Sequence, residues 1–204
     1  PLGRIIGVYD NDLERLANFS KLNNLHAYSS LQDLLADSNI DVVNICTPNG
    51  THADLAIKVL ESGKNVVVEK PMAISVESAK EMQEIATKTG LKLFVVKQNR
   101  YNPPVRAVKD LIKTGKLGKV FMVSVNCYWN RNNDYYLQSP WRGTKDLDGG
   151  VLYTQFSHFI DILYYLFGEI QNVNGKVQNA THKELIEFED SGVFSFEFKN
   201  EGIG

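Results

Sequence analysis

Cysteine is scarce in this sequence, and neither sign of charge dominates. Cys46 and Cys127 are the only two cysteines in 204 residues, too few for a disulfide framework or a four-cysteine metal site, so we predict no metal centre. Their apolar, strand-like neighbours favour buried free thiols in a reducing compartment. The 22 Lys and Arg residues and 24 Asp and Glu residues leave a net charge of −2, which gives no reason to expect a nucleic-acid or anionic-membrane partner.

Long apolar runs are absent as well. No stretch is long enough to span a bilayer, and no secretory leader is visible, although the chain starts at Pro1 without a methionine. We therefore expect a cytoplasmic protein without a membrane partner. A hydrophobic content of 43% and a charged content of 23% are ordinary for a globular protein, and 204 residues allow one large or two modest domains.

An apolar run followed at once by charge stands out at Asn65–Pro71. Val66, Val67 and Val68 predict a strand covered on both faces, and Glu69 and Lys70 follow it directly. Ligands of open α/β sheets bind just beyond the carboxyl ends of the strands. A lysine partly stripped of water at that place loses its proton more easily. The alternative, a strand end with solvated charges, has about even weight from these residues alone.

Strands and helices alternate through the first half of the chain. Strands are expected at 4–10, 41–46, 65–68 and 91–97, and helices at 13–20, 31–36, 51–62 and 76–89. Such alternation predicts right-handed βαβ units and a parallel sheet. We predict an α/β fold, with a Rossmann-type doubly wound parallel sheet over residues 1–98. Its first strand is missing from this chain, because the strand ending at Asp10 has no obvious partner before it.

The pattern changes from about Asn99. Helices are expected at 103–114 and 151–167, and strands at 119–129, 171–178, 185–189 and 193–198. Residues 130–148 form a loop of a length that is usually functional or mobile. We predict an α+β domain over residues 99–204 with a largely antiparallel open sheet. The turn at 202–204 should lead into another strand, so we interpret the chain as a fragment of a longer protein.

Residues that can hold a dinucleotide follow the expected strands. An acid such as Asp10 at a strand end accepts hydrogen bonds from the ribose diol and repels a 2′-phosphate, which favours NAD over NADP, although a plain helix cap is the better interpretation of Asp10 alone. The glycine-rich phosphate loop that should precede this strand is absent from the sequence. Thr47, Pro48 and Asn49 are expected to line the same crevice. For His52, in the next helical turn, a capping or packing role is favoured over catalysis.

A second group of polar residues lies in the helix opened by Gly149–Gly150. Gln155 and His158 are spaced to share one face of this apolar helix. A histidine with its hydrogen bonds satisfied in the core is the favoured interpretation of His158 by itself. The glycine pair permits a close backbone approach, which strengthens the alternative of a functional histidine.

Taken together, these motifs resemble the glucose–fructose oxidoreductase/inositol dehydrogenase/MocA (Gfo/Idh/MocA) family of NAD(P)-dependent oxidoreductases. Within it, the loop 139–144 and the run 154–158 are most similar to UDP-N-acetylglucosaminuronate 3-dehydrogenases of cell-surface polysaccharide synthesis. Many relatives carry an acid four residues before the histidine, where this sequence has Thr154. The matching segments cover essentially the whole chain: 41–49 with His52, 69–71, 99–103, and Gly149–Gly150 followed by His158 and Asp161.

The resemblance implies an enzyme that oxidises a secondary hydroxyl of a sugar, with NAD as cofactor and a nucleotide-linked uronic acid as the expected substrate. In that interpretation Lys70 hydrogen-bonds the reacting hydroxyl and His158 accepts or relays its proton. Guanidinium groups suit a carboxylate or pyrophosphate, and aromatic rings can cover the nicotinamide or sugar. The expected cofactor residues are Asp10, Thr47, Pro48, Asn49, His52, Glu69, Lys70, Trp141 and Arg142, and the expected substrate residues are Lys70, Asn99, Arg100, Tyr136, Thr154, Gln155 and His158, with Arg131 as a further candidate.

Two other functions stay open at this point. A non-catalytic sugar- or nucleotide-binding protein on the same scaffold is favoured by the absent phosphate loop. The open sheet of residues 99–204 also predicts a homo-oligomer, a dimer or tetramer, because an exposed sheet face must be covered.

Overall fold

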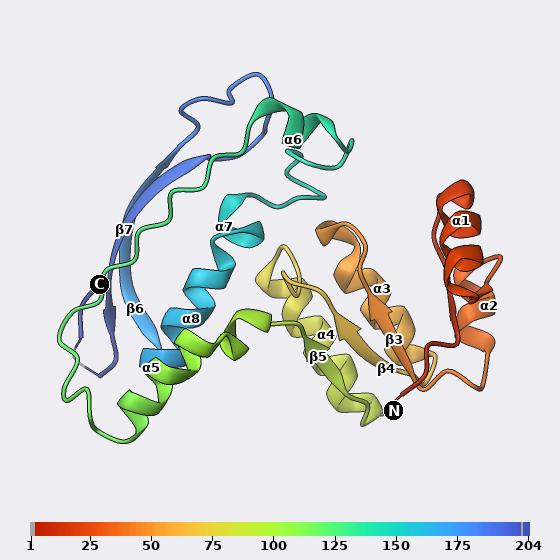
Figure 1. Ribbon diagram of the computed structural model, residues 1–204, viewed down its shortest axis with the longest axis horizontal. Coiled ribbons are helices and arrows are strands. Elements are labelled where there is room, and N and C mark those ends of the chain that lie inside the picture. The colour runs from red at the N-terminus through yellow and green to blue at the C-terminus, as the bar shows by residue number, and fades with distance from the viewer. Residues whose placement is uncertain (1–2, 201) are drawn as a thin grey trace.

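The computed structural model describes residues 3–200 and 202–204, which fold into two lobes (Figure 1). Residues 3–97 form the first lobe, on the right of the view, and later residues form the second, whose long sheet curves along the left. The short connection between the lobes runs from β5 to α5. Within the described residues, no helix is both long and apolar enough to cross a bilayer.

The first lobe contains the expected parallel strands, divided between two sheets. β1 (Gly7–Val8) pairs with β2 (His26–Ala27), and β3 (Val42–Ile45), β4 (Asn65–Val68) and β5 (Leu93–Val95) pair in that order. The parallel arrangement was therefore predicted correctly, while β2 was missed because two residues carry no periodicity. The helices are α1 (Leu13–Asn23), α2 (Leu31–Ala36), α3 (His52–Glu61) and α4 (Val76–Thr89), with a 3-10 turn η1 (Asn49–Thr51) before α3.

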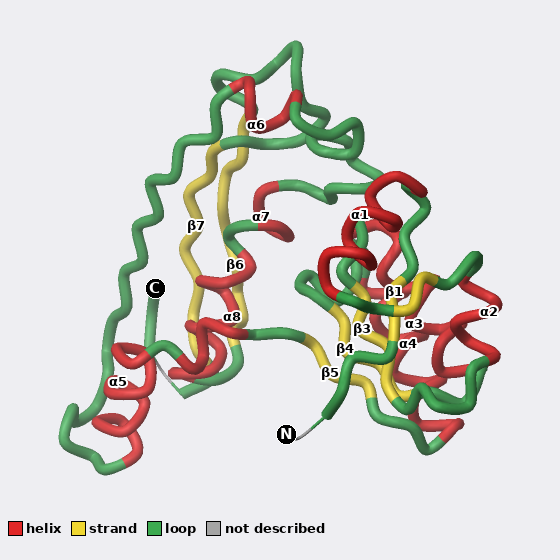
Figure 2. The backbone as a smooth tube through the Cα atoms, turned by 45° about the vertical axis from the view of Figure 1, so that its right-hand side comes forward, coloured by secondary structure: helices red, strands yellow, loops and turns green. Residues whose placement is uncertain are grey.

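The core of this lobe lies between β3–β5 and the helices α3 and α4, which pack together over one face of the sheet (Figure 2). Val66 and Val68 point into this core and are fully buried with Leu60 and Met82. Val67, on the opposite face, is half-buried. The strand predicted to be covered on both faces is thus closed on one face only.

The expectation of buried thiols is wrong, although both cysteines are free. Cys46 is exposed and Cys127 is half-buried. Val42, Asn44 and Cys46 alternate along β3 and its end and share its uncovered face, so all three side chains are open to solvent.

The second lobe combines helices with an antiparallel pair of strands. β6 (Ile170–Gln178) pairs with β7 (Ser191–Phe198) in antiparallel register, as predicted. The strand expected at 185–189 is wrong. That segment is a turn whose Glu187 N–H donates to the Gly143 carbonyl at 2.9 Å, so tertiary contacts replace a sheet ladder. The helices are η2 (Gln98–Tyr101), α5 (Pro103–Lys113), α6 (Asn133–Leu137), α7 (Val151–Thr154) and α8 (Ser157–Phe167).

The long strand expected at 119–129 is extended chain without a continuous ladder. It runs along the same side of the lobe as β7 (Figures 1 and 2), but among the described residues its one bridge joins Met122 to Ile203. Ile203 also bridges Glu197 of β7, so residues 202–204 lie between the extended segment and the sheet. The alternating pattern of this segment therefore predicted its backbone conformation but not its partner.

Hydrogen bonds join the two lobes at η1. The Asn49 side-chain amide donates to the Asp148 carbonyl at 2.8 Å, and the Gly50 N–H donates to the Leu147 carbonyl at 2.9 Å. A Cβ atom on Gly50 would lie 2.0 Å from the backbone oxygen of Asp146, which no rotamer change relieves. Only glycine permits this approach, so the start of α3 and the loop before α7 are held together.

Gly50→Ala is therefore expected to lower the free energy of unfolding by about 1–3 kcal/mol, the usual cost of overpacking. Denaturant titration measures the change. Gly3→Ala is the matched control, because a Cβ at Gly3 meets no atom within 4 Å. Equal unfolding midpoints for the two variants would contradict the close docking of the lobes.

Candidate active site

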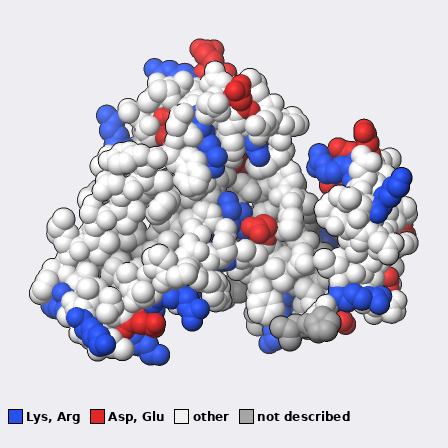
Figure 3. Space-filling view, viewed as in Figure 1, with Lys and Arg blue, Asp and Glu red and all other residues white. Residues whose placement is uncertain are grey.

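The carboxyl ends of β3, β4 and β5 bring the predicted site residues of the first lobe to one edge. Thr47 and Pro48 follow β3, Glu69 and Lys70 follow β4, and Lys97 follows β5. This edge faces the second lobe, and the space-filling view shows basic and acidic atoms together in the hollow between the lobes (Figure 3). The edge of the sheet is therefore where the two lobes form a common site.

Lys70 crosses from the first lobe to the second. Its Nζ donates to the Thr154 carbonyl at 3.0 Å, at the junction of α7 and α8. Burial lowers the pKa of Lys70, the nearby Glu69 carboxylate opposes that shift, and the positive charge of Lys97 adds to it. Lys70 is joined to Pro71 by a cis peptide bond, and its own N–H donates to Glu69 Oε2 at 3.2 Å. The alternative of a strand end with solvated charges is therefore not what the structure has.

The single helix expected at 151–167 is wrong, since it is broken into α7 and α8. The Phe156 N–H reaches back to the Val151 carbonyl at 2.9 Å, one residue further than in an α-helix. The Thr154 carbonyl then accepts from Lys70 Nζ and from the Ser157 hydroxyl, at 3.0 and 3.3 Å. The break thus turns a helical carbonyl towards Lys70, and tertiary contacts that no local pattern reports replace the helical bond.

His158 lies in the first turn of α8, next to this break. It is 8% exposed, and its ring makes no hydrogen bond within the described part of the chain. Burial lowers the pKa of His158, the charges of Lys70 and Lys97 lower it further, and Asp161 opposes them. A neutral imidazole is a competent proton acceptor. Lys70 and His158 therefore share one electrostatic environment rather than opposite sides of the molecule.

The two glycines before α7 allow the close approach that the sequence suggested. Gly149 and Gly150 have φ angles of +87° and +112°, and a Cβ on Gly149 would lie 2.7 Å from Ile74 Cγ2. Both positions need a conformation that other residues rarely adopt. The pair seats α7 against the loop that follows β4 and so brings the helix break to Lys70.

Arg100 has a different partner from the substrate oxyanion predicted for it. Its Nε and Nη2 donate to the two carboxylate oxygens of Asp161 at 2.8 and 2.6 Å, in a bidentate fork. Its guanidinium also lies over the Tyr165 ring, 5.1 Å from the centroid. Asn99, in the same 3-10 turn, is half-buried and accepts from the Asn102 amide at 3.5 Å. This turn links β5 to α8, and the carboxylate that Arg100 binds is that of Asp161.

The other predicted arginines lie in a cluster of aromatic rings. The Arg131 guanidinium lies 4.2 Å from the Tyr135 ring centroid and donates to Gln155 Oε1 at 3.1 Å. Arg142 lies on the same ring at 4.3 Å and 5.8 Å from Trp141, and it donates to the Tyr135 carbonyl. The loop expected at 130–148 is therefore ordered around stacked cations rather than solvated.

Several predicted site residues have structural partners. The two ring nitrogens of His52 contact the Pro71 and Thr47 carbonyl oxygens at 2.7 and 2.9 Å, which supports the packing role favoured for it. Tyr136 is buried, its ring packs against His182, and burial raises its pKa to about 12. The Thr154 hydroxyl donates to the Gly150 carbonyl. Tyr136 and Thr154 also line a second cavity, of about 510 Å³, together with Arg131 and Gln155.

Asp10 lies at the carboxyl end of β1, as expected. Its carboxylate accepts from the Asp12 N–H at 2.9 Å and from Arg15 at 3.5 Å. The N-cap of α1 is Asp12, which accepts from the Arg15 N–H, so the helix-cap interpretation belongs to Asp12. Asp10 keeps a partly exposed carboxylate at the place where a ribose diol is expected.

Three site residues were missed by sequence reasoning. Lys97 and Ser157 line a cavity of about 620 Å³ beside α8, and Asp148 is 2% exposed next to the glycine pair. Asp148 Oδ2 accepts from the Gly143 N–H, Oδ1 has no hydrogen-bond partner among the described residues, and burial raises the pKa of the carboxyl group. Lys97 follows a strand as Lys70 does, so the position that singled out one lysine was available for the other.

Comparison with known proteins places this arrangement in a family. The sequence profile described as "Oxidoreductase family, NAD-binding Rossmann fold" matches residues 1–97, and the "GFO/IDH/MocA C-terminal domain" profile matches residues 105–204. The chain belongs to the Gfo/Idh/MocA family of oxidoreductases. The resemblance and the fold class expected from the sequence are thus confirmed, while the exact boundary near residue 98 stays a prediction.

Among solved members of the Gfo/Idh/MocA family, the WlbA dehydrogenase of Bordetella pertussis, in complex with NADH and UDP-GlcNAcA, is 37% identical with a TM-score of 0.93. The WlbA dehydrogenase of Chromobacterium violaceum, in complex with the same two molecules, is 36% identical with the same TM-score of 0.93. In each case the match covers 98% of this chain and 57% of the other. The NAD-binding profile and these complexes agree with NAD as the predicted cofactor.

Curated Gfo/Idh/MocA relatives are more distant. An uncharacterised oxidoreductase of Schizosaccharomyces pombe is 32% identical over 167 residues, which are 82% of this chain and 45% of that protein. The levoglucosan dehydrogenase of Pseudarthrobacter phenanthrenivorans is 32% identical over 147 residues, 72% of this chain and 38% of that protein. The chain spans about half the length of the first curated relatives that it matches, at 44–47%.

Proposed function

We propose that the protein is an NAD-dependent dehydrogenase that oxidises a secondary hydroxyl of a nucleotide-linked uronic acid to a ketone. The observation that carries this proposal is the meeting of Lys70 with the break between α7 and α8, directly beside His158. A lysine and a histidine from different lobes, both with lowered pKa, suit the removal of a proton from an alcohol.

The two side chains have distinct roles in this proposal. Lys70 donates a hydrogen bond to the reacting hydroxyl oxygen, and its ammonium stabilises the negative charge that develops there. His158, neutral near pH 7 because its pKa lies below the ordinary 6.5, accepts the hydroxyl proton. NAD, when bound, would supply the acceptor for the hydride on the same carbon. Proton and hydride both leave the sugar, so a ketone is formed.

The chain offers suitable residues for the cofactor. Asp10 is expected to accept hydrogen bonds from the ribose diol, and its charge disfavours the 2′-phosphate of NADP. Thr47 and Pro48, at the end of β3, are expected to line the crevice, with Glu69 and Lys70 on the neighbouring strand end. The exposed part of the Trp141–Arg142 loop is expected to cover the nicotinamide side. Asn49 and His52, in contrast, are held by the protein itself.

The substrate class is supported by the relatives and by the basic character of the site. Both WlbA structures contain UDP-GlcNAcA, a nucleotide-linked uronic acid. Lys70, Lys97 and Arg131 place positive charge around the site, which suits a substrate with a diphosphate and a carboxylate. Gln155, oriented by Arg131, is a further candidate contact. A role in polysaccharide synthesis, a cytoplasmic location and a dimeric or tetrameric state are parts of the same proposal.

The proposal is tested by mixing the full-length protein with NAD and UDP-GlcNAcA and following NADH absorbance. We expect NADH to form with this substrate, and NADPH to form more slowly when NADP replaces NAD. Binding of NADH and UDP-GlcNAcA without any turnover would favour the alternative of a non-catalytic binding protein. Light scattering of the same sample decides whether the expected oligomer exists.

A further inference from the structure

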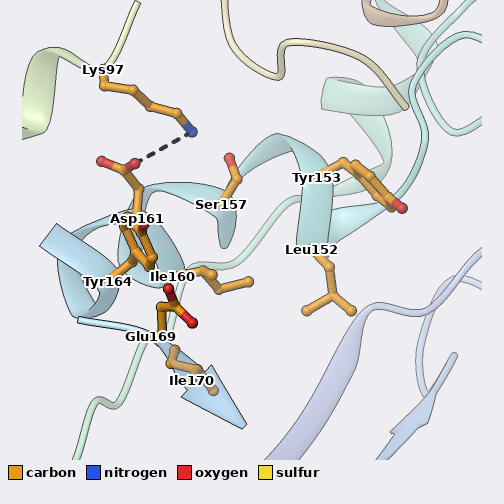
Figure 4. A pocket seen from close by; sticks show the side chains of 9 residues that line it. All are labelled: Lys97, Leu152, Tyr153, Ser157, Ile160, Asp161, Tyr164, Glu169 and Ile170. Atoms are coloured by element: carbon orange, nitrogen blue, oxygen red, sulfur yellow. Dashed lines mark ion pairs between the residues drawn. The ribbon is translucent and has the colours of Figure 1, made fainter. Parts of the chain in front are cut away.

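Lys97 lies at the wall of a cavity and makes no side-chain hydrogen bond to any residue that the structure describes. It lines the cavity of about 620 Å³ together with Ser157, the two acids Asp161 and Glu169, and several apolar side chains of α7 and α8. Glu169 is paired with Lys199. In Figure 4 the Lys97 side chain reaches across to α8, and its ammonium and the Ser157 hydroxyl point into the same space. The side chain is 25% exposed, so most of it is stripped of water.

The ion pair between Lys97 and Asp161 is long, and Arg100 already binds the same carboxylate. Lys97 Nζ lies 3.9 Å from Asp161 Oδ1, beyond hydrogen-bond distance, while both Asp161 oxygens accept from Arg100 at 2.8 and 2.6 Å. The charge of Asp161 is therefore neutralised by Arg100. Lys97 keeps its donors unused within the described part of the chain, and burial lowers its pKa while Asp161 opposes the shift. An anion placed in the cavity would satisfy this ammonium.

One wall of the cavity, at Ser157, borders the helix break that holds Lys70. The Ser157 hydroxyl, in the cavity wall, and Lys70 Nζ both donate to the Thr154 carbonyl, at 3.3 and 3.0 Å. Lys97 is also close enough to lower the pKa of Lys70 and of His158. A sugar whose hydroxyl meets Lys70 and His158 therefore extends a neighbouring substituent towards Lys97.

We propose that Lys97 binds the carboxylate of the uronic acid and selects acidic sugars over neutral ones. This inference rests on the proposed function. It gives Lys97 the carboxylate-binding role that the sequence suggested for Arg100. Arg100 holds Asp161, and Asp161 in turn keeps Lys97 directed at the cavity. The substrate carboxylate would accept the hydrogen bonds that the Lys97 ammonium does not make to Asp161.

The test is Lys97→Met in the full-length protein, which keeps the aliphatic stem and removes the charge. We expect the KM for UDP-GlcNAcA to rise by about 10- to 100-fold, the usual effect of losing a charge-assisted hydrogen bond. The affinity for NADH, measured by fluorescence, should change by less than about twofold. UDP-GlcNAc, which has a hydroxymethyl group in place of the carboxylate, should bind equally to both proteins. Lys97→Arg should recover part of the loss because it restores the charge.

Each outcome separates the two proposals. If the wild-type protein binds UDP-GlcNAcA no better than UDP-GlcNAc, the uronic acid assignment fails and the role of Lys97 fails with it. If the wild type prefers the acid but Lys97→Met keeps that preference, only the role of Lys97 is wrong. A loss of affinity for NADH, UDP-GlcNAcA and UDP-GlcNAc alike would show that Lys97 is needed for the fold, and would overturn the inference. Lys92→Met, at an exposed lysine, controls for the change of charge.

Discussion

Lys70→Met is expected to lower kcat by about 10³-fold while the protein still binds NADH. Methionine keeps the length of the side chain but removes the ammonium that donates to the Thr154 carbonyl and, in our proposal, to the reacting hydroxyl. The developing charge on the substrate oxygen then has no donor. Steady-state kinetics with UDP-GlcNAcA measures the loss, and NADH fluorescence shows whether the cofactor site persists.

Lys92→Met is again the appropriate control, because Lys92 is exposed and lies at the opposite end of β5 from the site. Its kcat should equal that of the wild type. Turnover by Lys70→Met within about threefold of the wild type would remove Lys70 from the mechanism, since single acid–base groups contribute at least about 10²-fold.

His158→Gln is expected to reduce kcat/KM by about 10²- to 10³-fold and to remove one limb of its pH profile. The pKa of His158 is lowered from 6.5 by burial and by Lys70 and Lys97. A base must be deprotonated to act, so wild-type kcat/KM should be constant near pH 7 and fall as the pH drops through a value below 6.5. Glutamine does not titrate, so kcat/KM of the His158→Gln variant should not fall in this way at low pH.

The control for this variant is His26→Gln, at an exposed histidine of β2. It should retain both the rate and the acid limb of the wild type. An acid limb at an unchanged pH in His158→Gln would assign that limb to another group and would contradict the role of His158 as base.

The first lobe was largely predictable because its signals are local. Val66–Val68 form the predicted strand through their own branched side chains, and α4 keeps the predicted bounds because Ser75 caps its start and Gly90 ends it. β2 lies outside this rule, since two residues gain their strand conformation only by pairing with β1. Local pattern therefore predicts the long elements and misses those defined by a neighbour.

The second lobe shows where local reasoning fails. The apolar pattern of 151–167 continues through Gln155 and Phe156, yet the helix breaks there because Thr154 bonds Lys70 from the other lobe. The segment 119–129 alternates as a strand should, but within the described residues it finds a partner only at Met122. In both cases the deciding contact comes from residues far away in the sequence.

The candidate site was predicted by residue type better than by role. Lys70 and His158 were singled out and lie together, but Arg100 was assigned to an oxyanion although its partner is Asp161. A guanidinium suits a protein carboxylate as well as a substrate carboxylate, and the sequence does not distinguish the two. Lys97 also follows a strand, a signal that was available in the sequence, but its place beside Asp161 and Ser157 depends on the packing of β5 near α8.

The most direct test of this account is a crystal structure of the full-length protein with NADH and UDP-GlcNAcA both bound. We expect one sugar hydroxyl, next to the nicotinamide ring, to lie within about 2.6–3.2 Å of both Lys70 Nζ and a ring nitrogen of His158. A sugar held with that hydroxyl in contact with neither side chain would contradict the dehydrogenase mechanism proposed for this chain.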